Sequence, residues 1–273
     1  MKKIAFLLFG CIALLQSALS NAAELTLKDL CNGTYYAKRI YGVTPMKDGE
    51  TYSQLSQDRK QIITYSFRDG NRKQVLFDVT TARNFNLEHI DGYIMSPDEK
   101  NILIQTETKY IYRRSFTAVY YLYNIQDRTM SRLSDNGPQQ APKFSPDGNM
   151  VGFVRDNNLF LVKLLFNNSE SQITKDGKFN EIINGIPDWV NEEEFGTNCS
   201  FDFNADNTMI AWIRYDESAV PLFSFPWYKG SHPAKSQYAE YPGRYEYKYP
   251  VAGAENATVS VQTFDIKSRV IRT

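Results

Sequence analysis

The chain has 273 residues, and its 31 Lys and Arg balance 31 Asp and Glu, so the formal net charge is zero. A nucleic-acid binder needs a surplus of cations to displace counterions, and a polybasic membrane patch needs the same surplus, so the composition argues against both classes. With 42% hydrophobic and 23% charged residues the chain is typical of a folded globular protein, and its 14% of aromatic residues favours strands.

The first residues have the layout of a secretory signal peptide. Lys2 and Lys3 give a positively charged start, and residues 4–15 form an almost unbroken apolar run. Ser20 and Ala22 then supply the small residues expected before a cleavage site. A membrane-spanning helix needs about 20 apolar residues, so a permanent anchor is the weaker alternative.

We therefore predict a signal peptide at residues 1–22 and a mature chain, residues 23–273, that is exported to the periplasm or secreted. No membrane attachment is expected once the signal is removed. An oxidising compartment would allow a bridge between Cys31 and Cys199, but we favour two half-buried free thiols.

A short turn recurs four times and organises the mature chain. Each copy has Ser or Asn followed two residues later by Asp, and these side chains bond nearby backbone and favour tight turns. Each turn precedes a short run rich in β-branched or aromatic residues, which is typical of strands. The turns are residues 56–59, 96–99, 145–148 and 204–207, and the runs are 61–65, 101–105, 150–154 and 209–213.

Further strand-like runs follow these, at residues 75–79, 119–123, 158–162 and 259–266. Four-stranded units of about 40–50 residues are typical of β-propeller blades. The alternative is a β-sandwich with fortuitous turns. We predict an all-β fold, a partial β-propeller of about four to five four-stranded blades, with a short helical glutamate segment inserted.

Few residues are candidates for catalysis. The sequence has no Gly-x-Ser-x-Gly nucleophile elbow and no Gly-rich phosphate loop. Its two histidines are His89, which we interpret as structural or solvated, and His232, which we place in a loop. We therefore assign no catalytic residue, no metal ligand and no cofactor.

One acidic segment interrupts the strand pattern. Glu192, Glu193 and Glu194 are consecutive and lie between Trp189 and Phe195. A solvated acidic loop is the alternative, but the flanking aromatic residues favour a short fixed helix or turn. Fixed carboxylates suit a cation such as a primary ammonium, with about 1.5–3 kcal/mol for each charge-assisted hydrogen bond.

Around this segment the chain resembles the dipeptidyl peptidase IV family of serine peptidases. The pattern Asp-Trp-Val-x-Glu-Glu-Glu at residues 188–194 is very similar to the glutamate motif of that family. Asn191 stands where the family usually has Tyr, and Val251 and Ala257 stand where it has Lys and Pro. The resemblance runs from about Leu25 to the last residue, and its other segments are residues 111–120, 184–187, 215–221 and 249–259.

The resemblance implies a role for each matching residue. Glu193 and Glu194 are expected to bind the free amino terminus of a peptide substrate, and Glu192 to support them. Arg113 is expected to bind the carbonyl oxygen of the second substrate residue, with Arg114 beside it. Together these groups measure two residues from the peptide end, so the implied reaction releases X-Pro or X-Ala dipeptides.

In the family, the Ser, Asp and His of a hydrolase domain cleave the substrate, and that domain follows an eight-bladed propeller. We therefore expect residues 23–273 to be the incomplete amino-terminal part of such a propeller, without the hydrolase domain and inactive alone. It would supply amino-terminus recognition and access gating, and the resemblance allows a homodimer of the full-length enzyme. The alternative is a stand-alone periplasmic binding or scaffold propeller without peptidase activity.

Cleavage is predicted before Ala23. Amino-terminal sequencing of the exported protein should therefore begin at Ala23 or Glu24. A chain that begins at Met1 and stays in the membrane fraction would instead show an uncleaved anchor.

Overall fold

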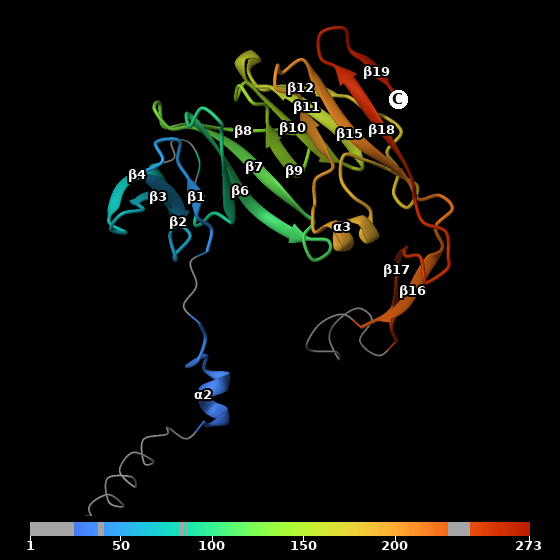
Figure 1. Cartoon of the computed structure of the whole chain (residues 1–273), viewed down its shortest axis with the longest axis horizontal. Helices are drawn as coiled ribbons and strands as arrows, with labels where there is room; N and C mark the ends of the chain where they lie inside the picture. The colour runs from blue at the N-terminus through green and yellow to red at the C-terminus, as the bar shows by residue number, and fades with distance from the viewer. Residues whose placement is uncertain (1–24, 38–40, 82–84, 86, 229–240) are drawn as a thin grey trace, which may run out of the picture. The chain divides into compact units, whose positions relative to one another are not determined.

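The computed structural model describes residues 25–37, 41–81, 85, 87–228 and 241–273 (Figure 1). The chain divides into two compact units, Met1–Gly42 and Val43–Thr273. The predicted signal peptide lies outside the described residues. Within those residues, no helix has both the length and the apolar character needed to cross a membrane.

The described part of the first unit contains α2 (Leu27–Cys31), a single short helix. Thr26 caps it, because its side chain accepts a hydrogen bond from the backbone N–H of Asp29 at 3.1 Å. The helix buries no side chain, so Cys31 is exposed rather than half-buried as predicted. The prediction of free thiols is confirmed for both Cys31 and Cys199.

The second unit contains four larger antiparallel sheets and a two-stranded ribbon, and each of the first three sheets is made from a consecutive stretch of chain (Figure 1). The first has β1 (Thr44–Pro45), β2 (Thr51–Leu55), β3 (Gln61–Ser66) and β4 (Arg72–Asp78); the second has β5 (Gly92–Met95), β6 (Asn101–Tyr110), β7 (Phe116–Asn124) and β8 (Thr129–Arg132). The third has β9 (Gln140–Phe144), β10 (Met150–Arg155), β11 (Asn158–Lys163) and β12 (Ser169–Gln172). In these three sheets the strands pair in chain order.

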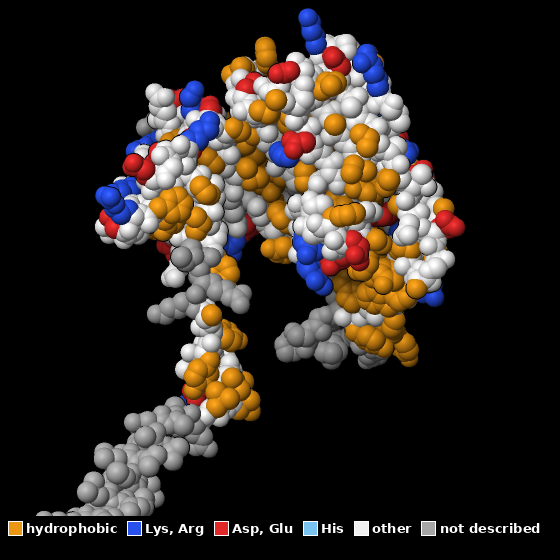
Figure 2. All heavy atoms as spheres, viewed as in Figure 1, with side chains coloured by type: hydrophobic (Ala, Val, Ile, Leu, Met, Phe, Trp, Pro, Cys, Tyr) orange, Lys and Arg blue, Asp and Glu red, His pale blue; other side chains and the backbone are white. Residues whose placement is uncertain are grey.

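The fourth sheet departs from this simple order. It has β13 (Ile182–Asn184), β14 (Phe201–Phe203), β15 (Met209–Asp216), β18 (Thr258–Asp265) and β19 (Val270–Arg272). Both β13 and β14 pair with β15, and the helix α3 (Trp189–Phe195) lies between them in the chain. A two-stranded ribbon, β16 (Leu222–Trp227) and β17 (Gly243–Lys248), is inserted between β15 and β18. Its hydrophobic side chains form a broad exposed patch in Figure 2.

The four recurring turns share one hydrogen-bonding scheme. In the third sheet, the Ser145 hydroxyl accepts from the backbone N–H of Met150 at 2.9 Å, which starts the pairing of β9 with β10. The same bond recurs from Gln61 N–H to Ser56, from Asn101 N–H to Ser96 and from Met209 N–H to Asn204. In every case the strand that follows is a central strand paired on both sides, so the turns fix where each sheet begins.

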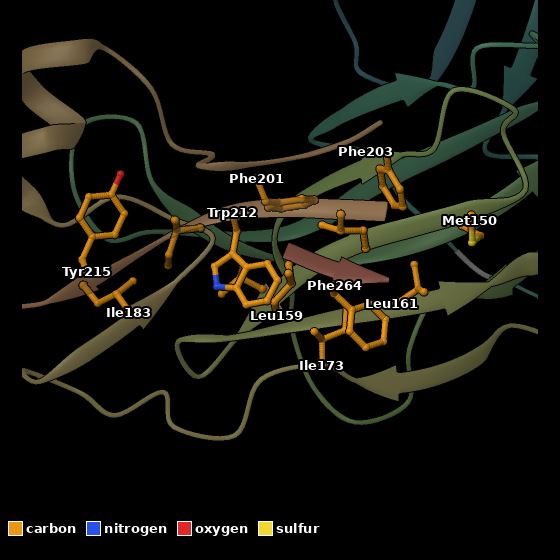
Figure 3. Packing of buried hydrophobic residues seen from close by; sticks show 13 residues of the cluster. Met150, Leu159, Leu161, Ile173, Ile183, Phe201, Phe203, Trp212, Tyr215 and Phe264 are labelled. Atoms are coloured by element: carbon orange, nitrogen blue, oxygen red, sulfur yellow. The ribbon is translucent and has the colours of Figure 1, made fainter. Parts of the chain in front are cut away.

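The sheets pack face to face, and alternation along the central strands supplies both faces. In β6, Ile102 and Ile104 belong to the cluster shared with the first sheet, whereas Leu103 belongs to the cluster shared with the third. In β10, Val151 and Phe153 pack towards the second sheet. The third and fourth sheets enclose the cluster shown in Figure 3, which is built around Trp212.

Gly152 makes the close packing of the third and fourth sheets possible. A Cβ at this position would lie 2.7 Å from Cε2 of Phe201, closer than real Cβ contacts come. The glycine therefore lets the Phe201 ring lie directly against the backbone of β10. Successive sheets packed in this way are the blades of a β-propeller, so the predicted fold is confirmed, with four blades in the described residues.

Ser145→Ala should destabilise the protein, because it leaves the buried N–H of Met150 without its side-chain acceptor. We expect a loss of about 1–3 kcal/mol in the free energy of unfolding, measured by urea denaturation. Ser56→Ala is the matched control, since the bond from Gln61 is only part-buried and water can replace the hydroxyl. Equal losses in the two variants would contradict this role for burial.

Candidate functional site

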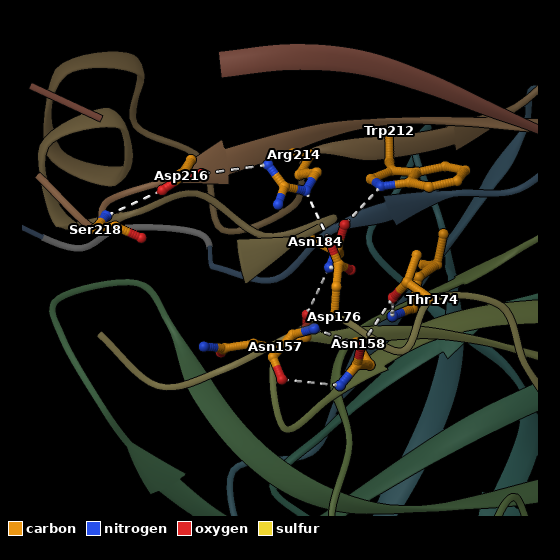
Figure 4. Close-up of polar contacts among 11 residues, drawn as sticks. Asn157, Asn158, Thr174, Asp176, Asn184, Trp212, Arg214, Asp216 and Ser218 are labelled. Carbon is orange, nitrogen blue, oxygen red and sulfur yellow. Dashed lines mark hydrogen bonds and ion pairs between the residues drawn. The ribbon is translucent and has the colours of Figure 1, made fainter. Parts of the chain in front are cut away.

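The chain enters the glutamate segment from β13 through a buried asparagine. Asn184 is fully buried, and its Nδ2 donates to Oδ1 of Asp176 at 2.9 Å and to the carbonyl of Asn157 at 3.3 Å. Its Oδ1 accepts from Nε1 of Trp212 at 3.0 Å (Figure 4). One side chain thus ties the third blade to the fourth at the point where the segment begins.

Gly185 continues the segment in a conformation that suits glycine, with φ of 79°. A Cβ there would lie 3.2 Å from Cγ2 of Val154 in the third blade. The Gly185 N–H donates to the carbonyl of Ile213 at 3.1 Å, and its carbonyl accepts from Ser200 at 2.8 Å. The backbone before α3 therefore has little freedom to move.

The helix α3 begins at a well-defined cap. The Asp188 carboxylate accepts from the backbone N–H of Asn191 at 2.9 Å and from its Nδ2 at 2.6 Å. The side chain of Asn191, at the position where the family usually has Tyr, thus adds a second bond to the cap. The helix ends at Phe195, where Gly196 takes a left-handed conformation. The prediction of a short fixed helix is confirmed.

Glu192 faces the protein interior and is 0% exposed. Its Oε1 accepts from the backbone N–H groups of Arg114 at 2.7 Å and of Ser115 at 2.9 Å, in the loop between β6 and β7. Its other carboxylate oxygen, Oε2, is buried and has no hydrogen-bond partner among the described residues. Glu192 therefore holds the helix of the fourth blade against a loop of the second.

That contact brings both arginines to the next glutamate. Oε2 of Glu193 lies 3.5 Å from Nε of Arg113 and 3.7 Å from Nη1 of Arg114. The carbonyl of Arg114 also accepts from Nδ2 of Asn198 at 3.1 Å, a contact that the sequence did not predict. Figure 2 shows acidic and basic side chains side by side at α3 and the β6–β7 loop. The Arg113 side chain is 73% exposed, so this ion pair contributes little to stability.

Glu194 stands apart from the other four predicted residues. Its side chain is exposed and forms no ion pair within the described part of the chain. Adjacent residues on a helix point in different directions, which explains why Glu193 meets the arginines and Glu194 does not. The structure thus brings together Arg113, Arg114, Glu192 and Glu193 and leaves the Glu194 carboxylate open to solvent.

The described residues contain no group placed for catalysis among the histidines and cysteines. His89 is exposed, 3.8 Å from Oδ1 of Asp91, as expected for a solvated histidine; His232 lies outside the described residues. Burial raises the pKa of the Cys199 thiol, which disfavours a reactive thiolate. Within the residues that the structure describes, no group of three or more His, Cys, Asp or Glu side chains is placed to hold a metal ion.

Comparisons with known proteins point to one family. Residues 96–273 match the family model described as the dipeptidyl peptidase IV N-terminal region. The crystal structure of Porphyromonas gingivalis dipeptidyl peptidase 4 aligns with a TM-score of 0.83 and 38% identity over 92% of this chain. A probable dipeptidyl-aminopeptidase B of Talaromyces stipitatus is 38% identical over 92% of this chain, and human prolyl endopeptidase FAP is 29% identical over 95%.

The chain spans only part of these relatives. It covers 35% of the Porphyromonas gingivalis chain, 30% of the fungal protein and 33% of the human protein. The similarity therefore concerns the region that contains the propeller blades and the glutamate helix.

Glu192→Ala should destabilise the fold, because it leaves the Arg114 and Ser115 N–H groups without an acceptor. We expect a loss of about 2–5 kcal/mol in the free energy of unfolding, measured by urea denaturation. Glu192→Gln keeps an acceptor oxygen and should lose less. Glu194→Ala is the matched control, since an exposed substitution should change stability by about 0.5 kcal/mol or less. A Glu192→Ala protein as stable as this control would show that the buried contact is not a structural clamp.

Proposed function

The chain belongs to the dipeptidyl peptidase IV family, and from this premise we propose that it is the substrate-recognising part of an exported dipeptidyl peptidase. Glu193 and Glu194 bind the ammonium of a peptide amino terminus. Arg113 binds the carbonyl oxygen of the second substrate residue. Release of X-Pro or X-Ala dipeptides and gating of access by the propeller belong to this proposal. Family membership supports both, and the signal-peptide layout of residues 1–22 supports export.

The availability of the Glu193 and Glu194 carboxylates to a ligand is the main support for the proposal. The shortest contacts of both arginines are with the same oxygen of Glu193, Oε2. Its carboxylate accepts no hydrogen bond from the described residues, so it can accept one from a ligand. Glu194 is the next residue of the same short helix, and its carboxylate is exposed. An ammonium has three N–H donors and no acceptor, so it can satisfy two neighbouring carboxylates at once.

Arg113 supports a second point of recognition. Its closest approach to Glu193 is from Nε, at 3.5 Å, and its side chain makes no hydrogen bond within the described part of the chain. A guanidinium has five N–H donors in a planar fork, so donors remain available for a carbonyl oxygen. Because Glu192 holds α3 and the β6–β7 loop together, the carboxylates and the guanidinium keep a fixed separation. A fixed distance between the carboxylates and the guanidinium would select the peptide carbonyl that lies at a set distance from the amino terminus.

Equilibrium binding of the peptide Ala-Pro-Ala to the mature chain tests the proposal. The free-amine peptide should bind more tightly than its N-acetylated form, which has no charge to pair with the carboxylates. Glu193→Gln and Glu194→Gln should each weaken binding by about 10- to 150-fold, the loss of one charge-assisted hydrogen bond worth about 1.5–3 kcal/mol. In the whole protein the same variants should lower kcat/KM for an Ala-Pro substrate to a similar extent.

Glu255→Gln is the matched control, because Glu255 is also exposed but lies away from α3 in the chain. It should leave the affinity unchanged. The reference is the affinity of the unaltered chain for the free-amine peptide. If both site variants bind that peptide, and the unaltered chain binds the acetylated peptide, within about twofold of this affinity, the glutamates form a solvated surface and do not recognise a peptide end.

A further inference from the structure

A cavity of about 460 Å³ lies beside the glutamate helix. It is bounded by the loop before β7, the turn between β10 and β11, and the residues that lead into α3. Neither arginine of the candidate site and none of its three glutamates lines it. Its volume is within the range of about 300–1,000 Å³ found for small-molecule sites.

Glu217 lines this cavity and is only 6% exposed. Its backbone is fixed, since its N–H donates to the carbonyl of Glu181 at 2.8 Å and its own carbonyl accepts from Val220 at 3.0 Å. Its carboxylate makes no hydrogen bond and no ion pair with any described residue. A buried carboxylate in that state is destabilising, because it has left water without gaining a partner.

Two other charged groups of the cavity are already engaged. Lys248, which also lines the cavity, donates from Nζ to the carbonyls of Val220 at 2.6 Å and Ser218 at 3.2 Å. The Asp188 carboxylate caps α3 through Asn191. Asp156 also lines the cavity but is exposed, so Glu217 is the buried acid of this cavity whose charge has no direct partner among the described residues.

One side of the cavity is apolar. Ile183, Ile186 and Pro187 line the side formed by the segment before α3, together with the indole of Trp189. Phe179 lines the cavity as well. These side chains provide contact area for an apolar group.

We propose that this cavity binds a small organic cation, an ammonium carried on an apolar body, with Glu217 as its counter-charge. The ammonium supplies the hydrogen bonds and the positive charge that the buried carboxylate lacks, and the apolar body fills the space along the hydrophobic walls. The inference does not rest on the peptide-end site, because it uses different residues. A free amine and the ammonium of a peptide share this chemistry.

Binding of such a cation should depend on pH. The pKa of Glu217 is raised to about 7, first by burial and then by the charge of Asp188, while Lys248 opposes the shift. The ionised form binds the cation, so affinity should rise as pH increases through 7. The other titratable or charged residues that line the cavity are Tyr112, Arg155, Asp156 and Lys178.

Benzylamine is a suitable probe, with benzyl alcohol as its neutral counterpart, and NMR titration of the mature chain measures binding. Benzylamine should bind about tenfold more weakly at pH 6 than at pH 8, as the ionised fraction of an acid with a pKa near 7 falls. Glu217→Gln should weaken it at pH 8 by at least about tenfold and abolish the pH dependence. The neutral isostere preserves shape, and the acid it replaces makes no hydrogen bond, so the variant should fold.

Glu255→Gln, at an exposed glutamate that does not line the cavity, is the matched control and should bind benzylamine like the unaltered chain. A hexapeptide with a free amine separates the two kinds of ligand that could supply the ammonium. If the hexapeptide displaces benzylamine, the ligand is a peptide end; if it does not, the ligand is a small free amine. Equal affinities for benzylamine and benzyl alcohol, or equal affinities in Glu217→Gln and the unaltered chain, would overturn the proposal.

Discussion

A single buried carboxylate holds the candidate site together. Glu192 lies on α3 in the fourth blade, and its Oε1 accepts from the N–H groups of Arg114 and Ser115 in the second blade. A charged acceptor in a dry environment binds N–H donors more strongly than a neutral one. Its cost is equally clear, because Oε2 is buried without a partner among the described residues. The buried contact thus lowers stability but fixes where the partly buried Glu193 and the exposed Arg113 meet.

That contact works because the blades on either side of it are rigid. Each central strand sends alternate side chains to two neighbouring blades, so the second, third and fourth blades form one continuous packed stack. The turn bonds of Ser145 and its counterparts fix the start of each sheet, and Asn184 joins the third blade to the fourth. A glutamate on one blade can therefore reach a loop two blades away at a constant distance.

Much of the fold is local and could be predicted from the sequence. The Ser or Asn and Asp of each turn bond backbone within five residues, so the pattern is visible without tertiary structure. The strands after the turns and the short glutamate helix were predicted for the same reason. The additional strand of the fourth blade was not predicted. Both β13 and β14 pair with β15, and this pairing depends on the position of α3, which lies between them in the chain.

The site was only partly predictable. The resemblance named Arg113, Arg114 and the three glutamates, but the partners of Glu192 are 77 and 78 residues away and depend on blade packing. The contact of Asn198 with the Arg114 carbonyl was not predicted, because it joins residues 84 apart in the sequence. The burial of Glu217 could not be predicted from the sequence, because Tyr-Asp-Glu-Ser at residues 215–218 is typical of an exposed turn. Long-range burial decides all three cases.

Amide hydrogen exchange at Arg114 and Ser115 tests the clamp most directly. Both N–H groups lie in a loop, where exchange is normally fast, but here they donate to the buried carboxylate of Glu192. If Glu192 joins the two blades, these two amides should exchange as slowly as those of β7 and lose that protection in Glu192→Ala. Exchange at the rate of an unprotected loop in the unaltered chain would show that the blades are not joined through this carboxylate.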